Sequence, residues 1–246
     1  MSNDFTPSAY RALLSTLLDR GYEVRGYADA EPHLRHLILR HDIDMSLDAA
    51  LPIGELEKAL ELKAHYFVLV RTEMYNVFSA GARKALRQLA ALGHEIGLHL
   101  DASLYDNAVP ALQRAADEEC AVLEAATGAP VRTISFHRPA QELLGYPEML
   151  AGRVHAYQPR FYTQMGYCSD SRGAWHHGHP LDHTAVRDGR ALQLLTHPVW
   201  WLEGGASPGA KAAAFLAARV DMLDRELANN CSVHQRGARV TGPNSP

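Results

Sequence analysis

The chain has 246 residues, of which 47% are hydrophobic and 21% are charged, and its formal net charge is -4 at pH 7. This composition is typical of one globular domain with a sizeable core, and the charge gives no electrostatic reason to expect nucleic acid as a partner. No apolar stretch is long enough to span a bilayer and the N-terminus has no signal-peptide pattern, so we expect a cytoplasmic protein without membrane insertion.

Helix and strand patterns alternate along the chain. Apolar residues at helical spacing predict helices at residues 7–20, 46–63 (interrupted near Pro52), 80–92, 108–126 and 210–227. Short apolar runs predict strands at residues 34–40, 65–70, 94–100, 131–136 and 191–195. Between residues 145 and 188 the periodicity fades, which is typical of functional or mobile loops. Strands that alternate with helices favour parallel pairing, in an open sheet or a barrel.

The predicted elements fill most of the chain, which indicates a single catalytic domain over residues 1–230. Residues 231–246 have the composition of a disordered tail. Three widely spaced cysteines, at positions 120, 168 and 231, form no CxxC pair and are expected to be reduced.

Ionisable side chains follow four of the predicted strands, and parallel strands bring such ends to one face. They are Asp42 and Asp44, His99 and Asp101, His137 and Arg138, and His197. Taken singly, each has an ordinary explanation as a helix cap, a hydrogen-bonded edge residue or a salt-bridge partner. Taken together, they predict one pocket, and aspartate with neutral histidine suits a divalent metal such as zinc.

Five short motifs in this order resemble those of the polysaccharide deacetylase (NodB homology) superfamily. They are Arg40–Asp44, in the DxD form of the first motif, Gly93–His99, Phe136–Pro139, Ser169–Trp175 and Leu194–Pro198. The Gly93–His99 run, GHEIGLH, is the most specific match. The resemblance implies an α/β fold, a distorted (β/α) barrel of about seven parallel strands.

The resemblance also implies catalytic roles. Asp42 would be the general base for the attacking water, and Arg138 would orient Asp42 and keep it ionised. His197 would be the general acid that protonates the leaving amine. Asp44 and His99 would bind the metal, which is expected to be zinc.

The second motif departs from the family pattern, in which a second histidine stands four residues after the first. Ser103 occupies that place here. His137 and Asp101 are the two candidates for the missing ligand, and we expect His137 because it restores a set of two histidines and one carboxylate. A third possibility is that no metal binds and the protein is a pseudoenzyme.

Aromatic residues gather in the late loops and at the last strand exit. Trp175 would wall the pocket, and Trp200 and the fourth-motif Asp170 are further candidates for substrate contact. Such rings can stack on sugars or simply pack loops onto the barrel. The run His176–His179 is either a metal site or a solvated loop, the latter being the ordinary explanation.

These observations predict a metal-dependent hydrolase that removes an N-acyl group, acetyl or formyl, from an amino sugar or glycan precursor. Bacterial surface polysaccharide synthesis, of the O-antigen kind, is the expected setting. The alternatives are a hydrolase of a non-sugar or cyclic amide and a non-catalytic carbohydrate-binding pseudoenzyme.

Overall fold

A computed structural model of the chain describes residues 5–105, 108–176, 178–202 and 207–237. Its contacts divide the chain into two compact units, Met1–Glu203 and Gly204–Pro246. The first unit contains the sheet and every candidate site residue. The boundary predicted at residue 230 lies inside the second unit, and the extent of the catalytic domain stays a prediction.

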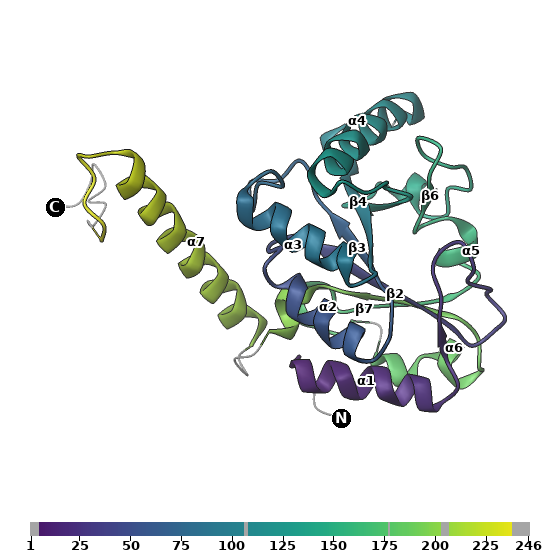
Figure 1. Ribbon diagram of the computed structural model, residues 1–246. Helices are drawn as coiled ribbons and strands as arrows, with labels where there is room; N and C mark the ends of the chain where they lie inside the picture. Colours follow the sequence, from purple (N-terminus) through teal and green to yellow (C-terminus); the bar gives the residue numbers. More distant parts are fainter. Residues whose placement is uncertain (1–4, 106–107, 177, 203–206, 238–246) are drawn as a thin grey trace. The chain divides into compact units, whose positions relative to one another are not determined.

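The first unit is an α/β fold whose strands are all parallel. Seven of them pair in the order β6-β5-β4-β3-β2-β8-β7, and the short β1 pairs with the start of β2. The sheet curls into a half-barrel surrounded by helices (Figure 1). The strands are β1 Glu23–Val24, β2 His36–Ile43, β3 His65–Val68, β4 Glu95–Asp101, β5 Thr133–His137, β6 Val154–His155, β7 Gly166–Ser169 and β8 Leu192–Thr196. The predicted class and parallel pairing are confirmed.

Successive helices pack side by side along one side of the sheet (Figure 1). The helices of this unit are α1 Pro7–Asp19, α2 Ala50–Ala59, α3 Ala80–Ala91, α4 Val109–Thr127, α5 Pro159–Tyr162 and α6 Thr184–Arg187. Pro52 was predicted to interrupt the second helix, but α2 is continuous through it. Proline is tolerated there because it lies in the first turn, where its missing N–H would have no helical partner.

Strand β2 runs three residues further than the sequence predicted, to Ile43 instead of Arg40. A charged residue usually marks the end of a buried strand, because burying a charge without a partner is costly. Arg40 is nevertheless fully buried, since it finds a carboxylate on its own strand. Asp42 therefore lies inside the sheet, and only Asp44 lies beyond the end of the strand.

The region between residues 145 and 188 contains structure that the sequence did not predict. Strands β6 and β7 and helices α5 and α6 lie there, and each is two to four residues long. A hydrophobic repeat can be recognised only over a longer stretch of sequence, so elements of two to four residues cannot be predicted from it.

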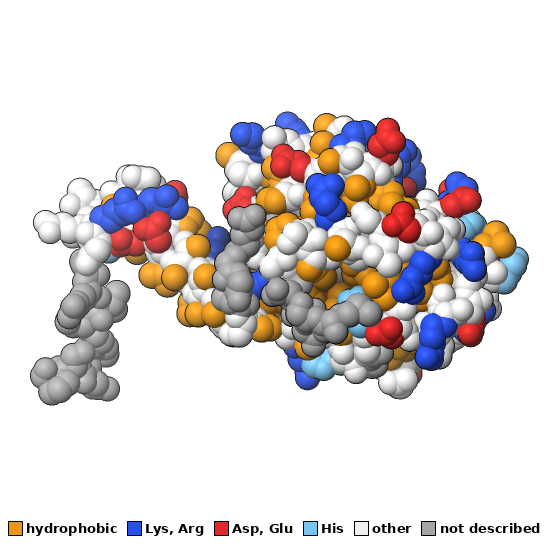
Figure 2. All heavy atoms as spheres, turned by 90° about the horizontal axis from the view of Figure 1, so that it is seen from below, with side chains coloured by type: hydrophobic (Ala, Val, Ile, Leu, Met, Phe, Trp, Pro, Cys, Tyr) orange, Lys and Arg blue, Asp and Glu red, His pale blue; other side chains and the backbone are white. Residues whose placement is uncertain are grey.

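The second unit contains one long helix, α7, which spans Pro208–Asn230. Four of its apolar side chains, Leu216, Val220, Leu223 and Leu227, are more than half exposed, and Figure 2 shows hydrophobic side chains along this helix. His234 turns back to Asp224, with Nε2 2.7 Å from Oδ1. The rest of the predicted tail, residues 238–246, lies outside the described residues. Across the described part of the chain, no helix combines the length and apolar character that a membrane crossing requires.

Candidate active site

Asp42 and Arg40 form a buried ion pair within β2. Their side chains lie on the same face because side chains alternate along a strand. Arg40 donates to Asp42 through Nε at 2.9 Å and through Nη2 at 2.7 Å. Burial raises the pKa of Asp42, but Arg40 and His99 lower it by more, so the pKa lies below its ordinary value. Asp42 is therefore an ionised carboxylate at neutral pH.

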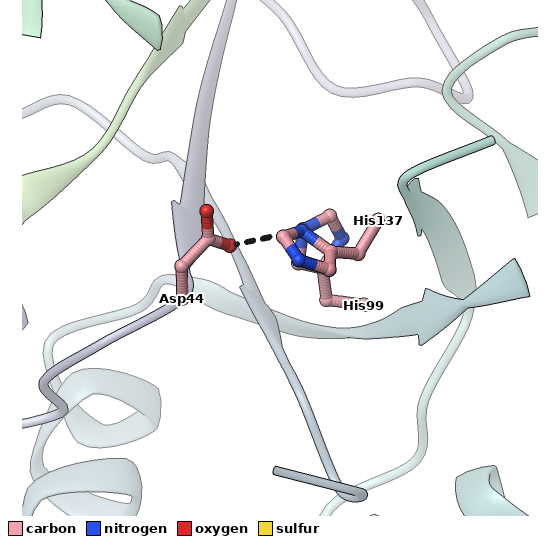
Figure 3. A group of neighbouring side chains, drawn as sticks. All are labelled: Asp44, His99 and His137. Atoms are coloured by element: carbon pink, nitrogen blue, oxygen red, sulfur yellow. Dashed lines mark ion pairs between the residues drawn. The ribbon is translucent and has the colours of Figure 1, made fainter. Parts of the chain in front are cut away.

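Asp44, His99 and His137 converge at the carboxyl edge of the sheet, where Asp44 faces the two imidazoles (Figure 3). Asp44 follows β2, His99 lies in β4 and His137 ends β5. Asp44 Oδ1 lies 3.2 Å from His99 Nε2 and 3.5 Å from His137 Nδ1. One ligand atom from each residue lies within 4.8 Å of the others. The structure thus brings together the three residues predicted as metal ligands.

These three residues fit a divalent cation. Asp44 Oδ1 is buried, and among the described residues none donates a hydrogen bond to it, although buried polar atoms are normally satisfied. Burial raises the pKa of Asp44, but His99, His197 and His137 lower it by more, to well below its ordinary value. Asp44 is therefore deprotonated, as a metal ligand must be. Two imidazoles and one carboxylate are a ligand set that zinc accepts.

Asp101, the alternative third ligand, is engaged elsewhere. Arg138 donates to it through Nε at 3.3 Å and also through Nη2. The hydroxyl of Ser103 donates to its Oδ1 at 2.7 Å. Ser103 stands where the family pattern has its second histidine, and here it supports Asp101 instead.

The predicted contact of Arg138 with Asp42 is wrong. Arg40 holds Asp42, whereas Arg138 pairs with Asp101 and has a side chain that is 60% exposed. The physical reason is distance along the strand: Arg40 stands two residues before Asp42 and points to the same side. Arg138 follows the end of β5 with a left-handed backbone, φ 49°, and is turned to the rim of the site.

His197 follows β8 on the opposite side of the cluster. Its Nδ1 lies 2.6 Å from Asp170 Oδ1, and its Nε2 lies 3.7 Å from Asp44 Oδ2. Burial lowers the pKa of His197, but Asp170, Asp44 and Asp42 together raise it by more, to about 9. His197 is therefore protonated at neutral pH, as a general acid requires.

Asp170 supports His197 and does not face the pocket. It is fully buried, accepts a hydrogen bond from the His197 backbone at 3.0 Å, and accepts another from Trp201 Nε1 at 2.6 Å. The predicted substrate contact of Asp170 is therefore replaced by a positioning role. Because Asp170 is 0% exposed and is not among the residues that line the pocket, a substrate does not reach it.

The aromatic candidates divide between packing and the pocket. Trp175 packs against Phe5 and Trp201, with ring centroids 5.5 and 6.0 Å apart, and it is absent from the described pocket wall. Trp200 does line the pocket, together with Tyr157 and Tyr167. Trp175 therefore packs within the fold, and contact of Trp200 with a substrate stays a prediction.

The pocket has a volume of about 420 Å³. Its wall includes Asp42, Asp44, His99, His137 and His197, so all of the proposed reacting groups open to one space. Two residues of the site were not predicted from the sequence. Arg40, which holds Asp42, could have been found from its spacing of two residues from Asp42 on a strand, whereas nothing in the sequence pointed to Arg172 on the pocket wall.

The histidine-rich run contributes no metal site to the described part of the chain. His177 lies outside the described residues. His179 accepts a hydrogen bond from the backbone N–H of Leu181 at 3.3 Å, as a turn residue does. The metal-ligand group found within the described residues is the one formed by Asp44, His99 and His137.

No protein-family model matches the chain, and no curated protein sequence matches it either. Solved structures do. A CE4 family pseudoenzyme from Bacillus anthracis is 13% identical with a TM-score of 0.41, and the match covers 83% of this chain and 64% of that one. A family 4 carbohydrate esterase from the same organism is 15% identical with a TM-score of 0.43, covering 84% and 85%. A Streptococcus pyogenes deacetylase in complex with acetate is 13% identical with a TM-score of 0.43, covering 80% and 86%.

These three structural neighbours are a pseudoenzyme, a carbohydrate esterase and a deacetylase. The chain spans less than two thirds of the length of the pseudoenzyme. At these identities the likeness concerns the fold, and the chemistry of this chain has to be derived from its own residues.

Proposed function

We propose that the protein is a metal-dependent hydrolase that removes an N-acetyl or N-formyl group from an amino sugar or glycan precursor. The observation that supports this most directly is the convergence of three kinds of group on one pocket: an ionised buried carboxylate, a protonated histidine and a fitting set of metal ligands. Amide hydrolysis needs each of them, because a base must activate water and an acid must protonate the amine that leaves.

Asp44, His99 and His137 would hold the cation. A divalent cation bound there supplies Lewis-acid chemistry, which polarises an acyl carbonyl and acidifies water. Zinc is the cation that we propose, because it takes two histidines and a carboxylate.

Asp42 accepts the proton of the attacking water. Its contact with Arg40 keeps it ionised and fixes its direction, since both carboxylate oxygens are held by the guanidinium. His99 Nε2 also lies 3.5 Å from Asp42 Oδ2, so the base stands directly beside the metal ligands.

His197 donates a proton from Nε2 to the leaving nitrogen as the C–N bond breaks. Asp170 holds Nδ1, which leaves Nε2 pointing to the site. The carboxylate also keeps the imidazole charged until the substrate nitrogen takes the proton. Surface polysaccharide synthesis and a cytoplasmic location remain predictions of the sequence.

The test is turnover of defined substrates. Purified protein with added zinc should release acetate or formate from a panel of N-acyl amino sugars. It should hydrolyse a panel of cyclic amides more slowly, which is measured as formation of the ring-opened product. Asp42→Asn should reduce the rate by at least about a hundredfold. Asp19→Asn, at an exposed position on α1, is the matched control and should not change it.

Retained turnover in Asp42→Asn, with unchanged metal content and circular dichroism, would show that another group is the base. Stoichiometric zinc with no release from any substrate would instead support a binding pseudoenzyme.

A further inference from the structure

Two arginines stand on the wall of the pocket, one on each of two loops. Arg138 follows β5, and Arg172 follows β7. Both have left-handed backbones, with φ values of 49° and 59°. This conformation is unfavourable for a residue with a Cβ, and it is found where the surrounding structure imposes it, often at functional sites.

Arg172 carries an uncompensated charge. Its side chain is exposed, and it forms no hydrogen bond or ion pair with any residue in the described part of the chain. An exposed arginine on an ordinary surface needs no partner. Arg172 differs because it belongs to the wall of a pocket that also contains the proposed reacting groups.

Arg138 is available because Arg40 has taken its expected place beside Asp42. Its pair with Asp101 uses Nε and Nη2. The Nη1 donors form no hydrogen bond with the described residues, and the side chain is 60% exposed. Arg138 therefore presents unused donors to the pocket while Asp101 fixes its direction.

Of the carboxylates near these arginines, Asp101 pairs with Arg138, and none among the described residues pairs with Arg172. Asp42 is paired with Arg40, and Asp44 belongs to the proposed metal site. What remains on the pocket wall are the guanidinium of Arg172 and the Nη1 donors of Arg138, and guanidinium donors match the oxygens of carboxylates and phosphates.

A second cavity, of about 750 Å³, adjoins the site. It shares Asp44, Met45, His137 and Arg138 with the pocket wall. Its own lining includes one more arginine, Arg71, and two carboxylates, Glu73 and Asp101. Arg138 therefore stands where the two spaces meet. A group larger than one sugar ring has room on this side.

We propose that the substrate is anionic: an amino sugar that carries a phosphate or a carboxylate, recognised by Arg172 and Arg138. This inference rests on the proposed function and adds the charge of the substrate and the residues that select it. Neither arginine takes part in bond breaking; both select for charge by direct contact with the oxyanion.

The test is binding to the full-length, metal-containing protein, measured by calorimetry at low and high salt. The probes are amino sugars without an acyl group, which cannot be hydrolysed: glucosamine, glucosamine 1-phosphate and glucosaminuronic acid. At low salt we expect at least one anionic probe to bind about tenfold more tightly than glucosamine, and the preference should shrink as salt rises. Tighter binding of glucosamine 1-phosphate would indicate a phosphate on the substrate, and tighter binding of glucosaminuronic acid would indicate a carboxylate.

Variants locate the contact. Arg172→Gln and Arg138→Gln should each remove most of the anion preference and leave glucosamine binding unchanged, whereas Arg172→Lys should keep part of it. Arg11→Gln, at an exposed position on α1, is the matched control and should change nothing. Equal binding of all three probes, or a preference that survives both glutamine variants, would overturn the inference.

The outcomes also separate this inference from the proposed function. If neutral N-acyl sugars are hydrolysed while anionic probes show no preference, the hydrolase stands and the charge selection fails. If the arginine-dependent preference is measured but no N-acyl sugar is hydrolysed, the anion site stands and the proposed activity fails.

Discussion

Replacement of Arg40 by methionine would remove one half of a buried ion pair while filling a similar volume. The Arg40 side chain is 0% exposed and that of Asp42 is 4% exposed. Besides Asp42, the guanidinium contacts Ser135, and it lies 4.8 Å from the centre of the Tyr157 ring. After the substitution, Asp42 keeps only the more distant His99, 3.5 Å away, and its opening to the pocket, and no guanidinium is left beside it.

The expected loss follows from the burial of the charge that is left behind. Opposite charges about 4 Å apart attract by about 4 kcal/mol at an effective dielectric constant of about 20. Breaking a buried pair by removing one partner costs about 3–5 kcal/mol of unfolding free energy, because the other charge loses its compensation. We therefore expect Arg40→Met to lose about 3–5 kcal/mol and the pKa of Asp42 to rise.

Urea unfolding of the metal-free protein measures this loss. Arg138→Gln is the matched control, because its pair with Asp101 is exposed on the arginine side and should be worth no more than about 1 kcal/mol. Adding Asp42→Asn to Arg40→Met removes the stranded charge and should restore more than half of the loss. If Arg40→Met costs no more than Arg138→Gln, or if Asp42→Asn gives no recovery, Asp42 does not depend on Arg40.

Three further outcomes are expected. His137→Ala should lose stoichiometric metal in elemental analysis, whereas Asp101→Asn should keep it; the reverse would make Asp101 the third ligand. Asp170→Asn should lower the pKa of His197 from about 9 toward 6.5 in NMR titration of the metal-free protein. Because the folded-state pKa is raised, the stability that this histidine contributes below pH 6.5 is lost as pH rises through 9, and the variant should lack that slope. Gly97→Ala should cost about 1–3 kcal/mol in thermal or urea unfolding, since its methyl would meet an aromatic carbon at 2.6 Å.

The central strands and long helices could be predicted because each is a run of residues with one dominant pattern. Residues 37–39 are three consecutive buried apolar residues, and 109–127 keep helical spacing for five turns. The short elements between residues 145 and 188 could not be predicted in this way. Their positions depend on contacts with segments elsewhere in the chain; β7, for example, is fixed by its pairing with β8.

The site was predictable to the extent that it depends on strand order. Asp44 follows β2, His99 lies near the end of β4 and His137 ends β5, and parallel pairing brings these positions to one edge of the sheet. The roles of Arg138 and Asp170 depend on side-chain direction within loops, which no periodicity encodes. The family resemblance assigned the contact with Asp42 to Arg138. Arg40 offers the same guanidinium group from a nearer position and makes that contact instead.

Asp42 is held by Arg40 on its own strand and not by Arg138, and this affects the whole pocket. A base held by an arginine on a separate loop depends on how that loop is placed, whereas Arg40 and Asp42 are fixed by the same strand and are both buried. Asp42 therefore keeps its charge and direction whatever the loop after β5 does. Arg138 on that loop can therefore be replaced without disturbing the base. Substitutions at Arg138 should therefore change which substrates bind and leave the pKa of Asp42 nearly unchanged. Substitutions at Arg40 should raise the pKa of Asp42 and have little effect on which substrates bind.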